Sequence, residues 1–356
     1  MRVLIVGGSG LLGGELVRLC AAQGHTVAAT RFSSPPGPGT PRTNGPAQDV
    51  RPGSDGPSPE PVTADGRPVT GGPSPAPGAA ATGGPAPGER LGPDLRTRPS
   101  PTTVAGGPSP APGAASGCGT CEWFRLDVRS RAAVPAVIGG FRPDVTINVA
   151  YRSGDWATTA DGAANVAAAV AASGGRLVHV SSDAVFSGDA PSYDETCLPD
   201  PVNPYGAAKA AAETAVRALV PGAAIVRTSL IVGHGASAHE AFVRSLATGS
   251  ATGVLFTDDV RCPVHVSDLA AALLEIAERG LPGVHHAAGD QALSRYELGL
   301  LIARRDGLDE KRLRPGLRAA GGVRGPLEVR LDCSATRRRL HTRLRPASEF
   351  LAPGHS

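Results

Sequence analysis

The sequence predicts an α/β fold with a doubly wound parallel sheet, and three observations support this prediction. Short β-branched runs alternate with Ala- and Leu-rich helical patterns, which indicates successive βαβ units. The first of these runs ends at a group of glycines, and the chain is long enough to bury a sizeable core. We predict strands at Arg2–Val6, His25–Thr30, Trp123–Asp127, Asp144–Val149, Arg176–Ser181, Ala223–Thr228 and Gly283–His286.

Helical patterns fall between these strands and continue after the sixth one. They have the spacing of apolar positions that buries one face of a helix. The predicted helices are Leu11–Gln23, Arg131–Ile138, Ala157–Ala172, Tyr205–Leu219, Ser267–Arg279 and Ser294–Arg304.

Residues 33–117 differ sharply in composition from the rest of the chain. They hold 21 of the 34 prolines, and the decapeptide GGPSPAPGAA occurs in them twice, at 71–80 and 106–115. Such a segment cannot bury enough apolar surface to offset the entropy cost of ordering it. We therefore expect a long disordered Pro/Gly-rich insertion between the second and third strands.

Charge and cysteine usage exclude several classes of protein. The net charge of +3 does not favour a nucleic-acid partner, and no apolar run is long enough to span a membrane. Six scattered cysteines and the absence of a recognisable leader are typical of a reducing, cytoplasmic setting. The pair Cys118 and Cys121 forms a single CxxC, which is more often without function than half of a zinc or redox site. No metal site is expected at the histidines, and Asp258 and Asp259 are expected to be solvated in a loop.

The glycine group follows the first strand and opens the first helix. Gly7, Gly10 and Gly13 read as GxxGxxG, with Leu11 and Leu12 between the last two glycines. In a Rossmann fold such a turn brings backbone amides and a helix N-terminus close to a pyrophosphate, although a tight turn without a ligand is the simpler alternative. Arg31 ends the second strand, where an acidic residue would bind the ribose of NAD, so NADP(H) is favoured and NAD(H) stays open.

A tyrosine and a lysine lie four residues apart at the start of the fourth predicted helix. The spacing of Tyr205 and Lys209 places both on one helix face, where the ammonium lowers the pKa of the phenol and prepares it for acid/base work. Ser182 ends the preceding strand and could hydrogen-bond a substrate carbonyl.

Taken in order, GGSGLLG, DVTINVA, VHVSSDAVFSG, NPYGAAKAAAE and IVRTSLIVG resemble the extended short-chain dehydrogenase/reductases. Within that class the chain is similar to the dTDP-4-dehydrorhamnose reductases, including the later stretches RCPVHVSDLA, GVHHAAGDQALSRYELG and VRLDCSATRRRL. The resemblance implies a catalytic trio of Ser182, Tyr205 and Lys209, with Tyr205 as the proton donor. It also implies cofactor contacts at Asp127, Val128, Ala150, Tyr205 and Lys209, and it matches Asn165 to the asparagine of a family helix.

The resemblance divides the chain into 1–32 plus 118–229, which bind the dinucleotide, and 230–356, which mainly bind the substrate with some return to the sheet. Ala184 and Leu230 replace a tyrosine and a tryptophan that the relatives usually carry near the sugar. Arg152 lies in another altered segment and could face either a substrate anion or solvent.

Three functions follow from these residues. The first is an NADPH-dependent reductase of a nucleotide-linked 4-keto-6-deoxy sugar, which could form a homodimer. The second is an epimerase or dehydratase of the same superfamily, for which no extra acid/base pair is evident. The third is a cofactor-binding regulatory subunit without turnover, as in methionine adenosyltransferase; the altered positions favour it and the intact trio opposes it.

Overall fold

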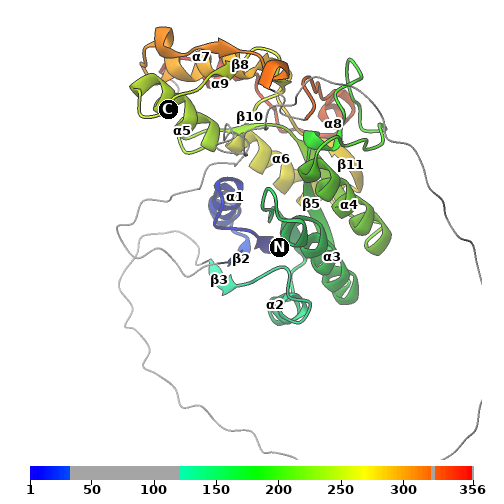
Figure 1. Cartoon of the computed structure of the whole chain (residues 1–356). Coiled ribbons are helices and arrows are strands. Elements are labelled where there is room, and N and C mark those ends of the chain that lie inside the picture. The colour runs from blue at the N-terminus through cyan, green and yellow to red at the C-terminus, as the bar shows by residue number, and fades with distance from the viewer. Residues whose placement is uncertain (33–120, 322–324, 355–356) are drawn as a thin grey trace, which may run out of the picture. The chain divides into compact units, whose positions relative to one another are not determined.

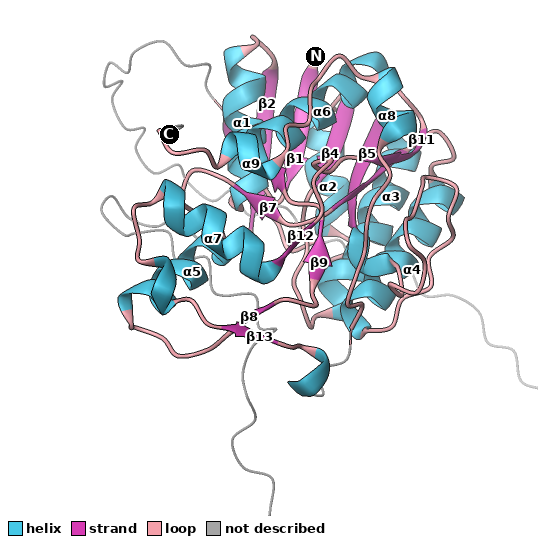
Figure 2. Ribbon diagram, turned by 90° about the horizontal axis from the view of Figure 1, so that it is seen from above, coloured by secondary structure: helices cyan, strands magenta, loops and turns pink. Residues whose placement is uncertain are grey.

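A computed structural model describes residues 1–32, 121–321 and 325–354 of the chain. The predicted insertion and Cys118 lie outside these residues. Seven parallel strands form the central sheet in the order β11-β6-β5-β4-β1-β2-β3 (Figures 1 and 2). The strands are β1 (Arg2–Val6), β2 (Thr26–Arg31), β3 (Glu122–Arg125), β4 (Val145–Asn148), β5 (Arg176–Ser182), β6 (Ala224–Thr228) and β11 (Gly283–His286).

Helices cover both faces of this sheet. Alternate residues of each central strand point to opposite faces, so Val3 and Ile5 pack with α1 and α6, whereas Leu4 and Val6 pack with α2 and α3. The predicted α/β class with a doubly wound parallel sheet is therefore confirmed. The sheet helices are α1 (Leu11–Ala22), α2 (Ala133–Phe141), α3 (Gly162–Ser173), α4 (Pro204–Leu219) and α6 (Val266–Arg279). A π-helical turn, η1 (Ala157–Asp161), precedes α3.

The C-terminal part of the chain contributes to the sheet and also forms a smaller apolar cluster beside it. In that cluster Val243, Leu298 and Phe350 pack together from three helices. The helices are α5 (Ala238–Thr248), α7 (Arg295–Arg305) and α9 (Ala347–Phe350), and a further short helix is α8 (Ser334–Arg339). Short strands pair locally: β7 (Ile231–Val232) with β10 (Val264–His265), β9 (Val260–Arg261) with β12 (Leu293–Ser294), and β8 (Leu255–Phe256) with β13 (Pro315–Gly316).

A capping box fixes the start of α5, a helix that the sequence patterns did not predict. Ser237 caps the helix, and Glu240 returns its carboxylate to the Ser237 amide in a capping box. The same fully buried carboxylate also accepts hydrogen bonds from the amides of Gly233 and Gly235 and pairs with Arg305 at 2.6 Å. Glu240 therefore fixes the loop that joins β7 to α5.

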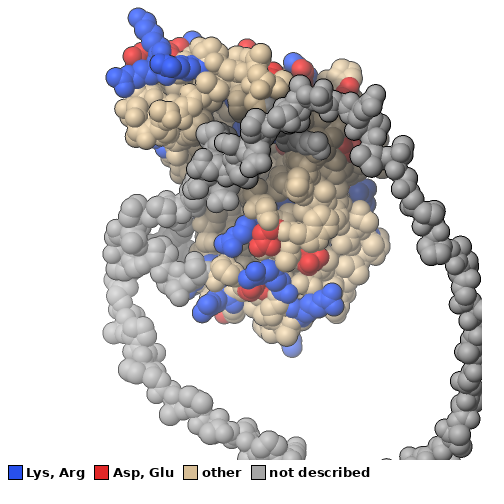
Figure 3. Space-filling model, viewed as in Figure 1, with Lys and Arg blue, Asp and Glu red and all other residues tan. Residues whose placement is uncertain are grey.

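Basic and acidic side chains lie next to one another on the face shown in Figure 3. Within the described residues, no helix is long and apolar enough to cross a bilayer.

Candidate active site

The glycine turn lies at the carboxyl end of β1, where α1 begins. A Cβ on Gly13 would stand 2.3 Å from the Gly7 carbonyl oxygen, so only glycine lets the first turn of α1 approach the end of the strand this closely. Gly10 is the N-cap residue of α1, and no described side chain caps this helix. Its first amides are thus available to an anion such as a pyrophosphate. Leu12 is buried in the core, so only its backbone could meet a ligand.

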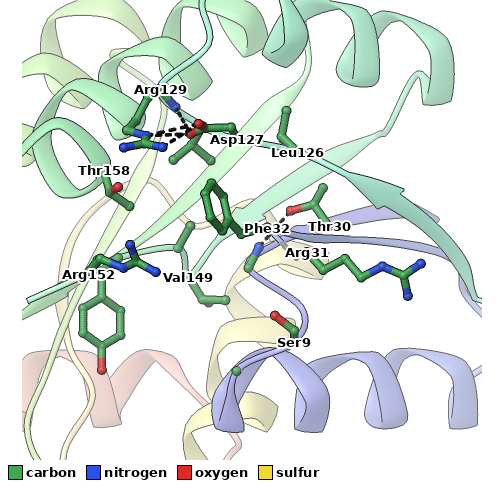
Figure 4. Close-up of a pocket in the computed structure, with 15 residues that line it drawn as sticks. Ser9, Thr30, Arg31, Phe32, Leu126, Asp127, Arg129, Val149, Arg152 and Thr158 are labelled. Carbon is green, nitrogen blue, oxygen red and sulfur yellow. Dashed lines mark hydrogen bonds and ion pairs between the residues drawn. The ribbon is translucent and has the colours of Figure 1, made fainter. Parts of the chain in front are cut away.

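A pocket opens beside this turn, between the ends of four neighbouring strands (Figure 4). Of the predicted cofactor residues, Gly7, Gly10, Arg31, Asp127, Val128 and Ala150 line it. Leu11 lines a second pocket, which lies between α1 and the start of α5. The carboxyl ends of β1, β2, β3 and β4 therefore bring these separate segments to one place, as expected for a ligand crevice in an open α/β sheet.

The pocket wall is basic and aromatic. The Arg129 side chain holds both carboxylate oxygens of Asp127 at 2.8–3.1 Å, and this interaction lowers the pKa of Asp127. The Phe32 ring lies in the middle of the pocket, with the guanidinium carbons of Arg129 and Arg152 at 5.5 and 5.6 Å from its centre (Figure 4). Arg152 therefore contributes to the wall of this pocket, which the sequence left undecided.

Arg31 ends β2 at the edge of the same pocket. Its guanidinium lies 5.7 Å from the centre of the Trp123 ring, and its Nε is buried without a hydrogen-bond partner among the described residues. A buried guanidinium N–H without an acceptor is costly, so this atom favours an anionic ligand. Together with the cradle at Gly13, it fits a dinucleotide whose phosphates lie beside this turn.

Ser182 ends β5, and the first turns of α4, which carry Tyr205 and Lys209, pack against this end of the strand. Asn203 caps α4, because its Oδ1 accepts a hydrogen bond from the Gly206 amide at 2.8 Å. A Cβ on Gly206 would be only 1.9 Å from the Ala184 carbonyl oxygen, so this glycine lets the first turn of α4 pack directly against the end of β5. Gly206 was not among the predicted site residues, although it lies between Tyr205 and Lys209 in the sequence.

Lys209 lies one turn after Tyr205 in α4 and is buried. Its side chain is 2% exposed, and Nζ donates a hydrogen bond to the Val180 carbonyl at 3.0 Å. Burial lowers the pKa of Lys209 to about 8, with Glu213 opposing the shift. His179 lies nearby in β5, where it contacts Asn148 at 3.2 Å, and burial and the charge of Lys209 lower its pKa to about 3.

The Ser182 hydroxyl has local partners. It accepts from the Ala184 amide at 3.2 Å and donates to Asp183 Oδ1 at 3.1 Å. The other oxygen of Asp183 accepts from Ser229 at 2.6 Å and lies 3.6 Å from Arg261 Nε. Asp183 therefore connects Ser182 to the C-terminal part of the chain.

Asp259 is not a solvated loop residue, and the expectation for this position was wrong. It is 3% exposed and pairs with Arg261, Arg295 and Arg318 at 2.9–3.3 Å. Burial of a carboxylate is tolerated here because three guanidinium groups surround it. Asp258, in contrast, accepts hydrogen bonds from two backbone amides.

Asn165 of α3 contacts the loop that follows β3. Its side chain donates to the carbonyls of Val128 and Arg129 at 3.0 and 3.3 Å, so it supports the loop that follows β3. Among the described residues, no group of three or more His, Cys, Asp or Glu side chains could hold a metal ion.

The seven-stranded parallel sheet, the glycine turn and the Tyr205–Lys209 pair define the class of the extended short-chain dehydrogenase/reductases. Residues 111–352 match the family model of the RmlD substrate binding domain. The chain belongs to this family.

Two kinds of curated relative are similar to the chain. A dTDP-4-dehydrorhamnose reductase of Mycobacterium tuberculosis is 35% identical over 206 residues, which cover 53% of this chain and 67% of the relative. The methionine adenosyltransferase 2 subunit beta of Xenopus laevis is 31% identical over 229 residues, which cover 59% and 69%. The relatives of the chain thus include both a reductase and a subunit of another enzyme.

Solved structures share the fold at low identity. The dTDP-4-dehydrorhamnose reductase of Bacillus anthracis in complex with NADP has a TM-score of 0.66 at 19% identity, covering 98% of this chain and 96% of its own. The WbmH enzyme of Bordetella bronchiseptica in complex with NAD+ also has a TM-score of 0.66, at 17% identity, covering 99% and 96%.

Proposed function

We propose that the chain is an NADPH-dependent reductase of a nucleotide-linked 4-keto-6-deoxy sugar. The observation that carries the proposal is the buried Lys209 one turn after Tyr205 in α4, at the sheet edge that also holds the pocket beside the glycine turn. A scaffold without chemistry has no need of a desolvated ammonium beside a phenol, since burying a charge is costly.

The residues suggest the following division of work. The amides at the start of α1 would hold the pyrophosphate, and Arg31 the 2′-phosphate. When bound, the nicotinamide supplies the hydride that adds to the ketone carbon. Tyr205 gives its phenolic proton to the ketone oxygen, and Ser182 exchanges its bond to Asp183 for one to the same oxygen. The Lys209 ammonium stabilises the phenolate that remains on Tyr205.

The direct test is NADPH oxidation by the full chain with a panel of dTDP-4-keto-6-deoxy sugars, followed at the nicotinamide absorbance, with NADH in parallel. We expect at least one ketone of the panel to be reduced, faster with NADPH than with NADH at equal subsaturating concentration. NADPH binding without reduction of any ketone in the panel would overturn the proposal.

A second candidate is a cofactor-binding subunit without turnover. The hydrogen bonds of the Ser182 hydroxyl to Ala184 and Asp183 favour it. Because of these bonds, the hydroxyl is already engaged and would have to give one up to bind a ketone oxygen. The similarity to the methionine adenosyltransferase 2 subunit beta points the same way. In that case bound NADPH stays unoxidised with every sugar.

Arg31→Ala is expected to weaken NADPH binding about tenfold to a hundredfold, because it removes a charge-assisted contact to the 2′-phosphate, and to leave NADH binding unchanged. Fluorescence titration with each cofactor measures both dissociation constants. Arg131→Ala, an exposed arginine that does not line the pocket, serves as the control. Equal losses of affinity for NADPH and NADH would show that Arg31 does not contact the 2′-phosphate.

A further inference from the structure

Tyr151 lies between the dinucleotide pocket and the catalytic pair. It follows Ala150, whose backbone lies so close to Gly7 that a Cβ added to Gly7 would stand 2.9 Å from the Ala150 Cα. Tyr151 lines the pocket and is 58% exposed as a residue, and its ring centre lies 6.0 Å from that of the Tyr205 ring. One side of an exposed aromatic ring thus belongs to the active site.

The same ring lies next to the Lys209 ammonium, with Nζ 5.1 Å from the ring centre. This is within the range in which the negative face of an aromatic ring attracts a cation. The other groups near Lys209 are the Val180 carbonyl of β5, which accepts a hydrogen bond from Nζ, His179 of the same strand, which burial holds neutral, and Glu213 from the same helix. Tyr151 is therefore the aromatic neighbour of a cation that is otherwise surrounded by buried groups.

We propose that Tyr151 is a positioning residue for Lys209. The Tyr151 ring covers the Lys209 ammonium and keeps it charged near Tyr205. Its link to turnover rests on the proposed reductase function, whereas its effect on the charge of Lys209 does not. The hydroxyl of Tyr151 is not needed for this role, since the ring face makes the interaction.

Two substitutions distinguish the effect of the aromatic ring face from the effect of apolar volume at this position. Tyr151→Phe keeps the ring and is expected to leave the pKa of Lys209 unchanged. Tyr151→Leu keeps apolar cover but removes the ring face, so the ammonium loses attraction while water stays excluded. We expect the pKa of Lys209 to fall by about one unit, a tenfold change in the ratio of ammonium to amine.

The composition of the chain makes this measurement direct. Among its 35 basic residues only two are lysines, Lys209 and Lys311, and Lys311 is exposed. In a Lys311→Arg background with 13C-labelled lysine, the side chain of Lys209 gives the one lysine signal to follow by NMR as the pH is raised. No substrate and no activity are required.

The matched control is Trp156→Leu. Trp156 lies five residues further along the chain, at the start of η1, is 50% exposed and does not line the pocket. We expect this change to leave the titration of Lys209 in place. An unchanged or higher pKa of Lys209 in Tyr151→Leu, or an equal fall in Tyr151→Phe, would overturn the proposal. Thermal unfolding of each variant checks that the site is intact.

Turnover provides the second measurement. Lys209 is charged below its pKa of about 8 and loses its proton as the pH rises through that value. The reductase activity is therefore expected to fall on the alkaline side, and in Tyr151→Leu this fall moves about one pH unit lower. If no sugar is reduced at all, the proposed function fails while the NMR titration still decides the role of Tyr151.

Discussion

Arg227→Met is expected to lower the free energy of unfolding by about 3–5 kcal/mol, on the order of 10 °C in Tm. Arg227 of β6 is 1% exposed, and its guanidinium holds both carboxylate oxygens of the fully buried Glu213 of α4 at 2.9 and 3.0 Å. It also donates to the Cys197 carbonyl and lies over the Phe186 ring. Methionine fills much of the volume but leaves a buried carboxylate without its main partner.

A second arginine on the same carboxylate supplies the control. Arg217 lies 3.4 Å from Glu213, but its side chain is 43% exposed. Arg217→Met is therefore expected to change stability by less than about 1 kcal/mol. The double variant Arg227→Met/Glu213→Leu should regain most of the loss, because no unpaired charge remains. Equal losses for Arg227→Met and Arg217→Met in urea unfolding would contradict this account.

For the proposed reductase, Tyr205→Phe is expected to reduce kcat about 10²–10⁴-fold, since it removes the proposed proton donor and leaves the ring. The pyrophosphate cradle and Arg31 are untouched, so the Kd for NADPH should change little. The effect belongs to the chemical step, and a smaller change in KM is expected. Stopped-flow oxidation of bound NADPH after mixing with the ketone substrate measures the step directly.

Tyr296→Phe is the matched control for this substitution. Tyr296 packs against the apolar cluster of α5, α7 and α9 and does not line the dinucleotide pocket. Its loss of a hydroxyl should leave kcat within about twofold of the wild type, an order-of-magnitude expectation for a side chain outside the site. A Tyr205→Phe enzyme that is as active as Tyr296→Phe would assign proton transfer to another group.

Much of the fold could be predicted because the inner strands of the sheet, such as β1, β4 and β6, are buried on both faces. Such strands appear as short continuous apolar runs, and each of the seven predicted runs overlaps a strand of the central sheet. Boundaries shifted by one or two residues, as at β2 and β3. The short strands β7 to β10, β12 and β13 have two residues each and leave no periodic pattern to detect.

The parts of the site that escaped prediction depend on contacts between distant segments. Gly206 matters because Ala184 lies against it, and Tyr151 matters because Lys209 lies below its ring. Asp259 becomes a buried charge only where three arginines from separate segments meet. Residue type and spacing are local information, so they locate Tyr205 and Lys209 on one helix but not the neighbours that other elements supply.

β2 and β3 are neighbours in the sheet, although β2 ends at Arg31 and β3 begins at Glu122. In the unfolded chain, pairing them closes a loop of about 90 residues, which costs about 2 kcal/mol more than a connection of about 10 residues. The pairing of β1 with β4 spans the same stretch, and contacts between such distant segments form slowly, so β1 and β2 are expected to join β3 and β4 late in folding. Leu126, Asp127 and Val128 follow β3 and line the pocket. The pocket at the ends of these strands is thus completed late in folding, and a nascent or partly refolded chain would gain the proposed affinity for a dinucleotide only then.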